Sequence, residues 1–93
     1  MPTITKKQQQ TDLQDKLNSP YIVWLHNDDY NSFDHVINCM MTICGHELEV
    51  AQQIAHIVHF TGKCDAKRGS LEEMTKIYNK LKSNNLTVSM ENA

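Results

Sequence analysis

One uninterrupted apolar run, Tyr21 to Leu25, constrains the fold of this chain more than any other segment. Its β-branched and aromatic side chains are typical of a buried central β-strand. The polar stretch from His26 to Asn31 follows at once. Asn and Asp side chains hydrogen-bond their own backbone and tolerate unusual angles, so this stretch is expected to be a loop held by a rigid strand.

Two helices are expected after this loop. Ser32 can cap the first, and Gly45 suits the left-handed position that ends it. Its buried stripe is expected to be Phe33, Val36, Ile37, Met40, Met41 and Cys44. The second helix is expected from about Glu47 to His59, and Gly62 marks its exit. It is so broadly apolar that packing on more than one side is expected.

The C-terminal third predicts a strand, a helix and a strand. Residues 63–67 are a weak strand candidate, and Ser70 with Glu73 forms a capping box for a third amphipathic helix. A turn at residues 84–85 precedes an alternating segment, residues 86–90, that is typical of a half-buried strand. The predicted fold is α+β in the order β-α-α-β-α-β, with three helices on a three-stranded antiparallel sheet.

The chain length allows one domain. Residues 1–18 contain few large apolar groups, so we expect a flexible N-terminal arm followed by a folded domain over residues 19–93. A domain of this size buries roughly 60% of its unfolded surface. Its small core favours a shallow surface pocket over a deep enclosed active site.

Charge is distributed unevenly along the chain. All nine Lys and Arg residues lie at or before Lys16 or at or after Lys63, whereas the stretch between them holds five acidic residues and all five histidines. This pattern disfavours a nucleic-acid partner and favours a cationic ligand. A solvated acidic face without a ligand remains the alternative.

Targeting and redox signals point to the cytoplasm. No run of about eighteen apolar residues could cross a membrane, and the N-terminal residues lack the apolar core of a secretory signal. The three cysteines, Cys39, Cys44 and Cys64, show no disulfide-framework spacing and are expected to be reduced.

The cluster Asn27-Asp28-Asp29 is the best candidate for a binding site. An ammonium ion has three N–H donors and needs acceptors around it. Asn27 offers an amide oxygen, Asp28 a carboxylate, and His59 a ring nitrogen if its helix packs beside the loop. A purely structural histidine is the alternative.

Zinc binding and catalysis are rival interpretations. His35 with Cys39, and His56 with His59, share helix faces, so a four-ligand zinc site can be imagined. However, zinc-finger spacings are missing. Cys39 and Cys44 lie in an acidic, apolar helix, which is unsuited to a cysteine nucleophile. We therefore expect neither an enzyme nor a cofactor.

Several motifs resemble the ClpS family of bacterial adaptors. The resemblance covers about two-thirds of the chain, from the apolar strand through Asn27-Asp28-Asp29-Tyr30 to Val58-His59-Phe60-Thr61-Gly62-Lys63. The pattern over residues 33–37 is similar to that of a shorter subgroup, common in Bacteroidetes-type bacteria.

The resemblance implies an N-degron adaptor. It would bind proteins that begin with Leu, Phe, Tyr or Trp and deliver them to the N-terminal domain of a Clp-type AAA+ unfoldase of the ClpA or ClpC class. Asn27, Asp28 and His59 would hold the α-amino group. The hydrophobic pocket would be lined by Asn31, Phe33, Val36, Ala55, Val58 and Leu86.

Other positions depart from the family or face its partner. Relatives often have Met at the position of Phe33, a larger residue at that of Ala55 and Thr at that of Asn31. The resemblance implies that Tyr30 and Glu72 face the unfoldase and that residues 1–18 are fed towards it. A generic protein–protein interaction module on the same fold is the alternative, because a fold does not dictate a function.

Overall fold

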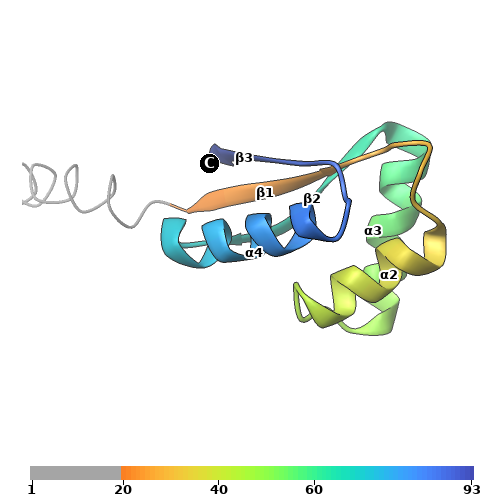
Figure 1. The fold of residues 1–93 in the computed structure, drawn as a ribbon, viewed down its shortest axis with the longest axis horizontal. Helices are drawn as coiled ribbons and strands as arrows, with labels where there is room; N and C mark the ends of the chain where they lie inside the picture. The colour runs from red at the N-terminus through yellow and green to blue at the C-terminus, as the bar shows by residue number, and fades with distance from the viewer. Residues whose placement is uncertain (1–19) are drawn as a thin grey trace, which may run out of the picture.

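The computed structural model describes residues 20–93, so the predicted arm over residues 1–18 lies outside the described residues. Figure 1 shows the fold. The elements follow in the order β1 (Tyr21–His26), α2 (Phe33–Thr42), α3 (Leu48–Thr61), β2 (Lys63–Gly69), α4 (Leu71–Ser83) and β3 (Val88–Asn92). This is the predicted α+β order. No helix in the described part of the chain is both long and apolar enough to span a bilayer.

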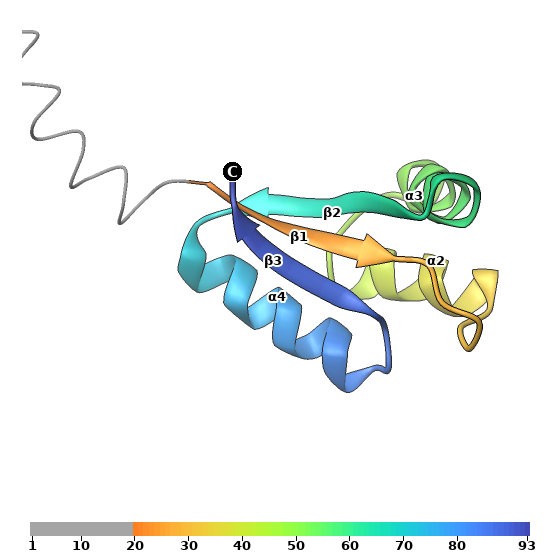
Figure 2. The same cartoon turned by 90° about the horizontal axis from the view of Figure 1, so that it is seen from above.

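The sheet is antiparallel throughout and has the order β2-β1-β3, with the apolar run at its centre as predicted. Tyr21 lies opposite Gly69 of β2 and Asn92 of β3, whereas the other end of β1 pairs His26 with Lys63. Seen from above, β3 and β2 flank β1 on its two sides (Figure 2). The described termini meet, because the Ala93 N–H donates to the Pro20 carbonyl at 2.9 Å.

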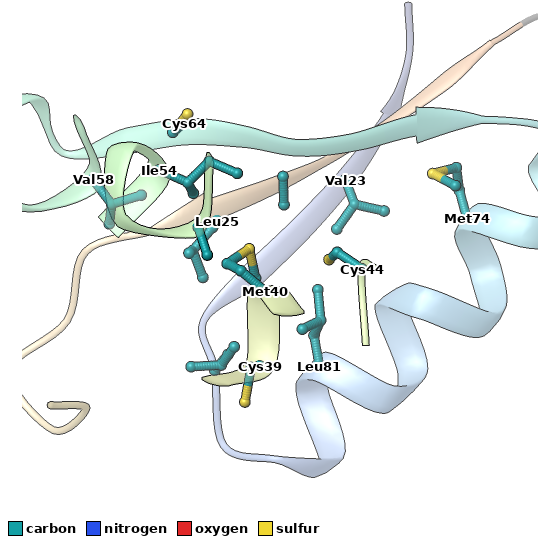
Figure 3. Close-up of a cluster of buried hydrophobic side chains, with 13 residues drawn as sticks. Val23, Leu25, Cys39, Met40, Cys44, Ile54, Val58, Cys64, Met74 and Leu81 are labelled. Carbon is teal, nitrogen blue, oxygen red and sulfur yellow. The ribbon is translucent and has the colours of Figure 1, made fainter. Parts of the chain in front are cut away.

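The helices divide the sheet between them. Helix α4 runs along the sheet and contacts all three strands, whereas α3 packs on β2 and α2 packs on α3 (Figure 1). Within residues 20–93, helices α2, α3 and α4 and strands β1 and β2 contribute side chains to one buried cluster, drawn in Figure 3. Its largest fully buried members are Leu25, Met40, Met74, Leu81, Val23 and Cys39.

The helix boundaries follow the predicted local signals. The Ser32 hydroxyl accepts the His35 N–H at 3.1 Å, and the Ser70 hydroxyl accepts the Glu73 N–H at 3.2 Å. Gly62 ends α3 with φ of 100°, a left-handed angle that favours glycine. These caps satisfy backbone groups that would otherwise lack partners at the helix ends.

Some burial predictions were wrong. Met41 and Phe33 of the expected buried stripe are 39% and 38% exposed. Helix α3 packs on more than one side, as predicted, because it contacts both β2 and α2. Its Leu48 and Ile57 side chains are nevertheless 49% and 44% exposed. These side chains lie on the helix faces that no neighbouring element of the described chain covers, so they meet solvent.

The last strand begins later than predicted. Leu86 is not in β3, because its N–H donates to the Leu81 carbonyl at 3.1 Å and so belongs to the turn that ends α4. Its side chain is nevertheless buried, at 4% exposure. The alternating pattern correctly predicted a strand, but Asn85 with φ of 69° delays its start.

Candidate functional site

The loop after β1 is fixed by backbone hydrogen bonds at its first residues. The His26 N–H donates to the Thr87 carbonyl, and the Asn27 N–H donates to the Gly62 carbonyl, both at 2.8 Å. Gly62 is the residue that ends α3, three positions after His59. The loop therefore starts beside the C-terminal end of α3, which brings the two parts of the predicted site together.

Asp28 organises this loop. Its Oδ1 accepts the N–H groups of Tyr30 at 3.0 Å and Asn31 at 2.9 Å. Its Oδ2 accepts the Asn31 side-chain amide at 2.8 Å and the Thr87 hydroxyl at 2.9 Å. A carboxylate has about four acceptor positions, so those of Asp28 are filled from within the chain.

The same hydrogen bonds keep Asp28 ionised. Burial alone raises the pKa of this carboxyl group, but the bonds from Asn31, Thr87 and Tyr30 outweigh it, so the pKa lies below its ordinary value of 3.8. Asp28 is therefore a negative charge at neutral pH. With its acceptor positions occupied, this carboxylate offers a nearby cation its charge more than free hydrogen-bond acceptors.

His59 is placed by aromatic neighbours. Its ring centroid lies 4.9 Å from that of Phe60, edge to face, and 5.6 Å from that of Phe33. Phe33 also contacts His56, with 5.2 Å between ring centroids. These contacts link the start of α2 to the last turns of α3 and restrict the orientation of the His59 ring.

A pocket of about 300 Å³ lies where the loop, α2 and α3 meet. This volume is at the small end for ligand pockets, which suits a single side chain with its attached main-chain group. The lining combines polar groups with apolar ones. It consists of Asn27, Asp28, Asp29, Asn31, Phe33, Val36, Ala55, Val58 and His59.

Eight of the nine sequence-predicted ligand residues line this pocket. Leu86 does not: with Tyr30, Asn31 and Thr87 it lines a neighbouring depression on the other side of the loop. Asp29 also lines the pocket, although no separate role was predicted for it. Its position in the Asn-Asp-Asp cluster was the available signal.

The two residues expected to face an unfoldase lie far apart. Tyr30 is 89% exposed in the loop beyond the end of β1. Glu72 is exposed in the first turn of α4, just after Gly69, which pairs with Tyr21 at the opposite end of β1. A partner that contacts both would have to extend along the length of the strand.

The cysteines are poorly suited to metal binding or nucleophilic attack. All three are buried, and burial raises the pKa of each thiol, that of Cys44 to about 11. The Cys39 sulfur lies 3.7 Å from His35 Nε2 without a further ligand nearby. Across residues 20–93, no three His, Cys, Asp or Glu side chains gather as metal ligands.

Comparison with known families decides the assignment. The family model described as "ATP-dependent Clp protease adaptor protein ClpS" matches residues 16–89, most of the chain. The chain belongs to the ClpS family. As a ClpS-family protein it is an adaptor of the ATP-dependent Clp protease, in agreement with the resemblance drawn from its motifs.

A solved structure supports the fold of this ClpS-family protein. The chain resembles Agrobacterium tumefaciens ClpS2, solved with L-phenylalaninamide bound, with a TM-score of 0.69 and 18% sequence identity. The match covers 81% of this chain and 98% of the relative. At this identity the likeness concerns the fold. No curated protein sequence gave a significant match.

Proposed function

We propose that this ClpS-family protein binds the first residue of a client protein through its free α-amino group and its large hydrophobic side chain. The observation that carries the proposal is the composition of the 300 Å³ pocket, which combines acceptors and negative charge with apolar walls. No Lys or Arg lies between residues 17 and 62, from which the whole lining comes. An α-ammonium group needs this environment.

The polar groups have distinct roles in this proposal. The Asn27 amide oxygen and a neutral His59 ring nitrogen accept hydrogen bonds from the ammonium group. Asp28 supplies negative charge close by and holds the loop in shape through its bonds to Asn31 and Thr87. Each hydrogen bond to a charged group contributes about 1.5–3 kcal/mol.

The apolar groups select the side chain. Val36, Ala55 and Val58 form walls, and the ring of Phe33 lies over the pocket rim, within contact of His59. Burying a Leu or Phe side chain contributes about 1.5–3 kcal/mol. The L-phenylalaninamide bound by Agrobacterium ClpS2 is an aromatic residue with a free α-amine, which is the ligand class proposed here.

The remaining steps follow from the family. We infer that the protein presents Leu-, Phe-, Tyr- or Trp-first clients to a ClpA- or ClpC-class unfoldase in the cytoplasm, with Tyr30 and Glu72 towards the partner. It does so by binding, without catalysis. Residues 1–18 would serve as the arm that extends towards the unfoldase.

A panel of labelled peptides tests the proposal. Peptides that begin with Phe or Leu should bind, as measured by fluorescence anisotropy, whereas the N-acetylated Phe peptide and a Met-first peptide should not. Acetylation removes the charge and the donors but leaves the side chain, so it is the matched control. Equal binding of all four peptides would mean that the pocket does not recognise the N-terminal residue of a peptide.

A further inference from the structure

A second groove adjoins the pocket on the far side of Phe33. It has a volume of about 620 Å³ and lies between α2 and α3. We call it the α2–α3 groove. Its lining is Phe33, Asp34 and Ile37 from α2, with Glu49, Gln52, Gln53 and His56 from α3.

Phe33 forms a wall of both cavities. The His59 ring, which lines the pocket, and the His56 ring, which lines the groove, both contact it, at centroid distances of 5.6 and 5.2 Å. The groove is therefore continuous with the pocket across a single side chain. An extended peptide advances about 3.3–3.6 Å per residue, so the second and third residues of a client that leaves the pocket past Phe33 would lie along the groove.

Two carboxylates line the groove, and its lining within residues 20–93 contains no Lys or Arg. Asp34 and Glu49 are exposed and form no ion pair within residues 20–93, where the ion pairs are Arg68–Asp65 and Lys76–Glu72. The closest basic residue in sequence, Lys63, lies over the Trp24 ring, 4.8 Å from its centroid.

The uncharged lining also suits a peptide. The side-chain amides of Gln52 and Gln53 can each donate to and accept from a peptide backbone. Ile37 and Phe33 provide apolar surface along which the aliphatic stem of a Lys or Arg side chain can pack.

We propose that the α2–α3 groove binds the second and third residues of the client and favours Lys or Arg there. The inference rests on the proposed function and specifies its substrate class: clients with a large hydrophobic first residue followed by basic residues. Exposed charge pairs are weak individually, so two favourable pairs should strengthen binding about three- to tenfold.

The test uses the full chain and four peptides of equal length that begin with Phe. One has Ala at positions 2 and 3, one has Lys there, one has Glu there, and one has Ala there but two Lys at positions 8 and 9. The last has the same charge as the second but cannot place it in the groove. We expect the Lys peptide to bind three- to tenfold more tightly than the Ala peptide and the Glu peptide more weakly, with the distal Lys peptide within twofold of the Ala peptide.

Matched variants assign the effect to the groove. In Asp34→Asn/Glu49→Gln the advantage of the Lys peptide should disappear while the affinity for the Ala peptide stays within twofold. Asp65→Asn/Glu91→Gln makes the same change in net charge on β2 and β3, outside the groove, and should retain the advantage. As a second probe, Gln53→Lys offsets one of the two negative charges of the groove and should reduce the advantage of the Lys peptide without abolishing it.

The outcomes separate the two levels of the proposal. If no Phe-first peptide binds, the proposed function itself is wrong. If the Ala peptide binds but Lys at positions 2 and 3 gives no advantage, or if the advantage survives in Asp34→Asn/Glu49→Gln, the pocket stands and the groove inference is overturned.

Discussion

Replacing Asp28 with asparagine should weaken peptide binding and also loosen the loop, because one carboxylate serves both purposes. Asparagine keeps an oxygen where Asp28 Oδ1 accepts the N–H groups of Tyr30 and Asn31. Its NH₂ group would then face the Asn31 side-chain amide, which is also a donor. The change removes the negative charge and at least one of the four hydrogen bonds.

The expected size of each effect follows from these contacts. A hydrogen bond to a charged group contributes about 1.5–3 kcal/mol, and the partial exposure of Asp28 favours the lower value. A loss of about 1.5 kcal/mol lowers the Tm of a small domain by about 6–12 °C. For binding, two unit charges roughly 5 Å apart at an effective dielectric of about 20 attract by about 3 kcal/mol. Exposure and salt reduce this to about half, which corresponds to about tenfold in Kd.

The assay combines calorimetric melting with anisotropy titration of a Phe-first peptide at two salt concentrations. Asp65→Asn is the matched control, because Asp65 is exposed and its ion pair with Arg68, at 3.8 Å, contributes little. The control should change Kd less than twofold. Asp28→Asn should bind at least tenfold more weakly, with a reduced salt dependence. Unchanged affinity together with an unchanged Tm would refute the dual role assigned to this carboxylate.

Three further predictions concern single groups. His59→Phe keeps a ring against Phe33 and Phe60 but removes the ring nitrogens. Its affinity for a Phe-first peptide, measured by calorimetry, should therefore fall at least tenfold with little change in Tm. Retained affinity would exclude His59 as an acceptor. Ala55→Leu places extra volume in the 300 Å³ pocket. Trp- and Phe-first peptides should therefore lose at least fivefold more affinity than Leu-first peptides. An equal loss for all three peptides would contradict the place of Ala55 in the pocket wall. Because the pKa of Asp28 is depressed in the folded state, its stabilisation is complete above the ordinary value of 3.8 and is lost as pH falls through the lower folded value. The difference in unfolding free energy between wild type and Asp28→Asn, measured by urea denaturation, should therefore be larger at pH 7 than at pH 3, and an equal difference at both would argue against it.

Local signals in the sequence predicted the elements well. The apolar run gave the central strand, Ser32 and Ser70 gave two helix starts, and Gly62 gave a helix end. Each of these signals acts within a few residues, so no tertiary information was needed. In a three-stranded sheet, the central place of the apolar run also gives the order β2-β1-β3. The register of the strands was not predicted, since it depends on which long-range pairs form.

Burial was predicted less well, for a tertiary reason. Periodicity shows which residues share a helix face but not how many neighbours a helix has. Phe33 and Met41 were therefore expected inside, although they are 38% and 39% exposed. Leu86 was assigned to a strand from its alternating pattern, but its N–H donates to the Leu81 carbonyl in the turn that ends α4. Its place in the pocket was implied by the family resemblance, and it lines the neighbouring depression.

The site lies between these cases. Asn27 and Asp28 were apparent from their place directly after a buried strand. The contact with α3 depends on a hydrogen bond from the Asn27 N–H to Gly62, which no local pattern predicts. The resemblance to the ClpS family supplied that pairing. The α2–α3 groove was not predicted, because Asp34 and Glu49 come together only through the tertiary packing of α2 against α3.

The most direct measurement of the central claim is a pair of NMR titrations of the uniformly ¹⁵N-labelled protein, one with L-phenylalaninamide and one with its N-acetyl derivative. If the pocket accepts a positively charged N-terminus, the free amine should shift the signals of Asn27, Val36 and His59 in a saturable manner. The acetylated compound should leave them in place. Identical shifts with both compounds, or shifts confined to other parts of the fold, would contradict the account.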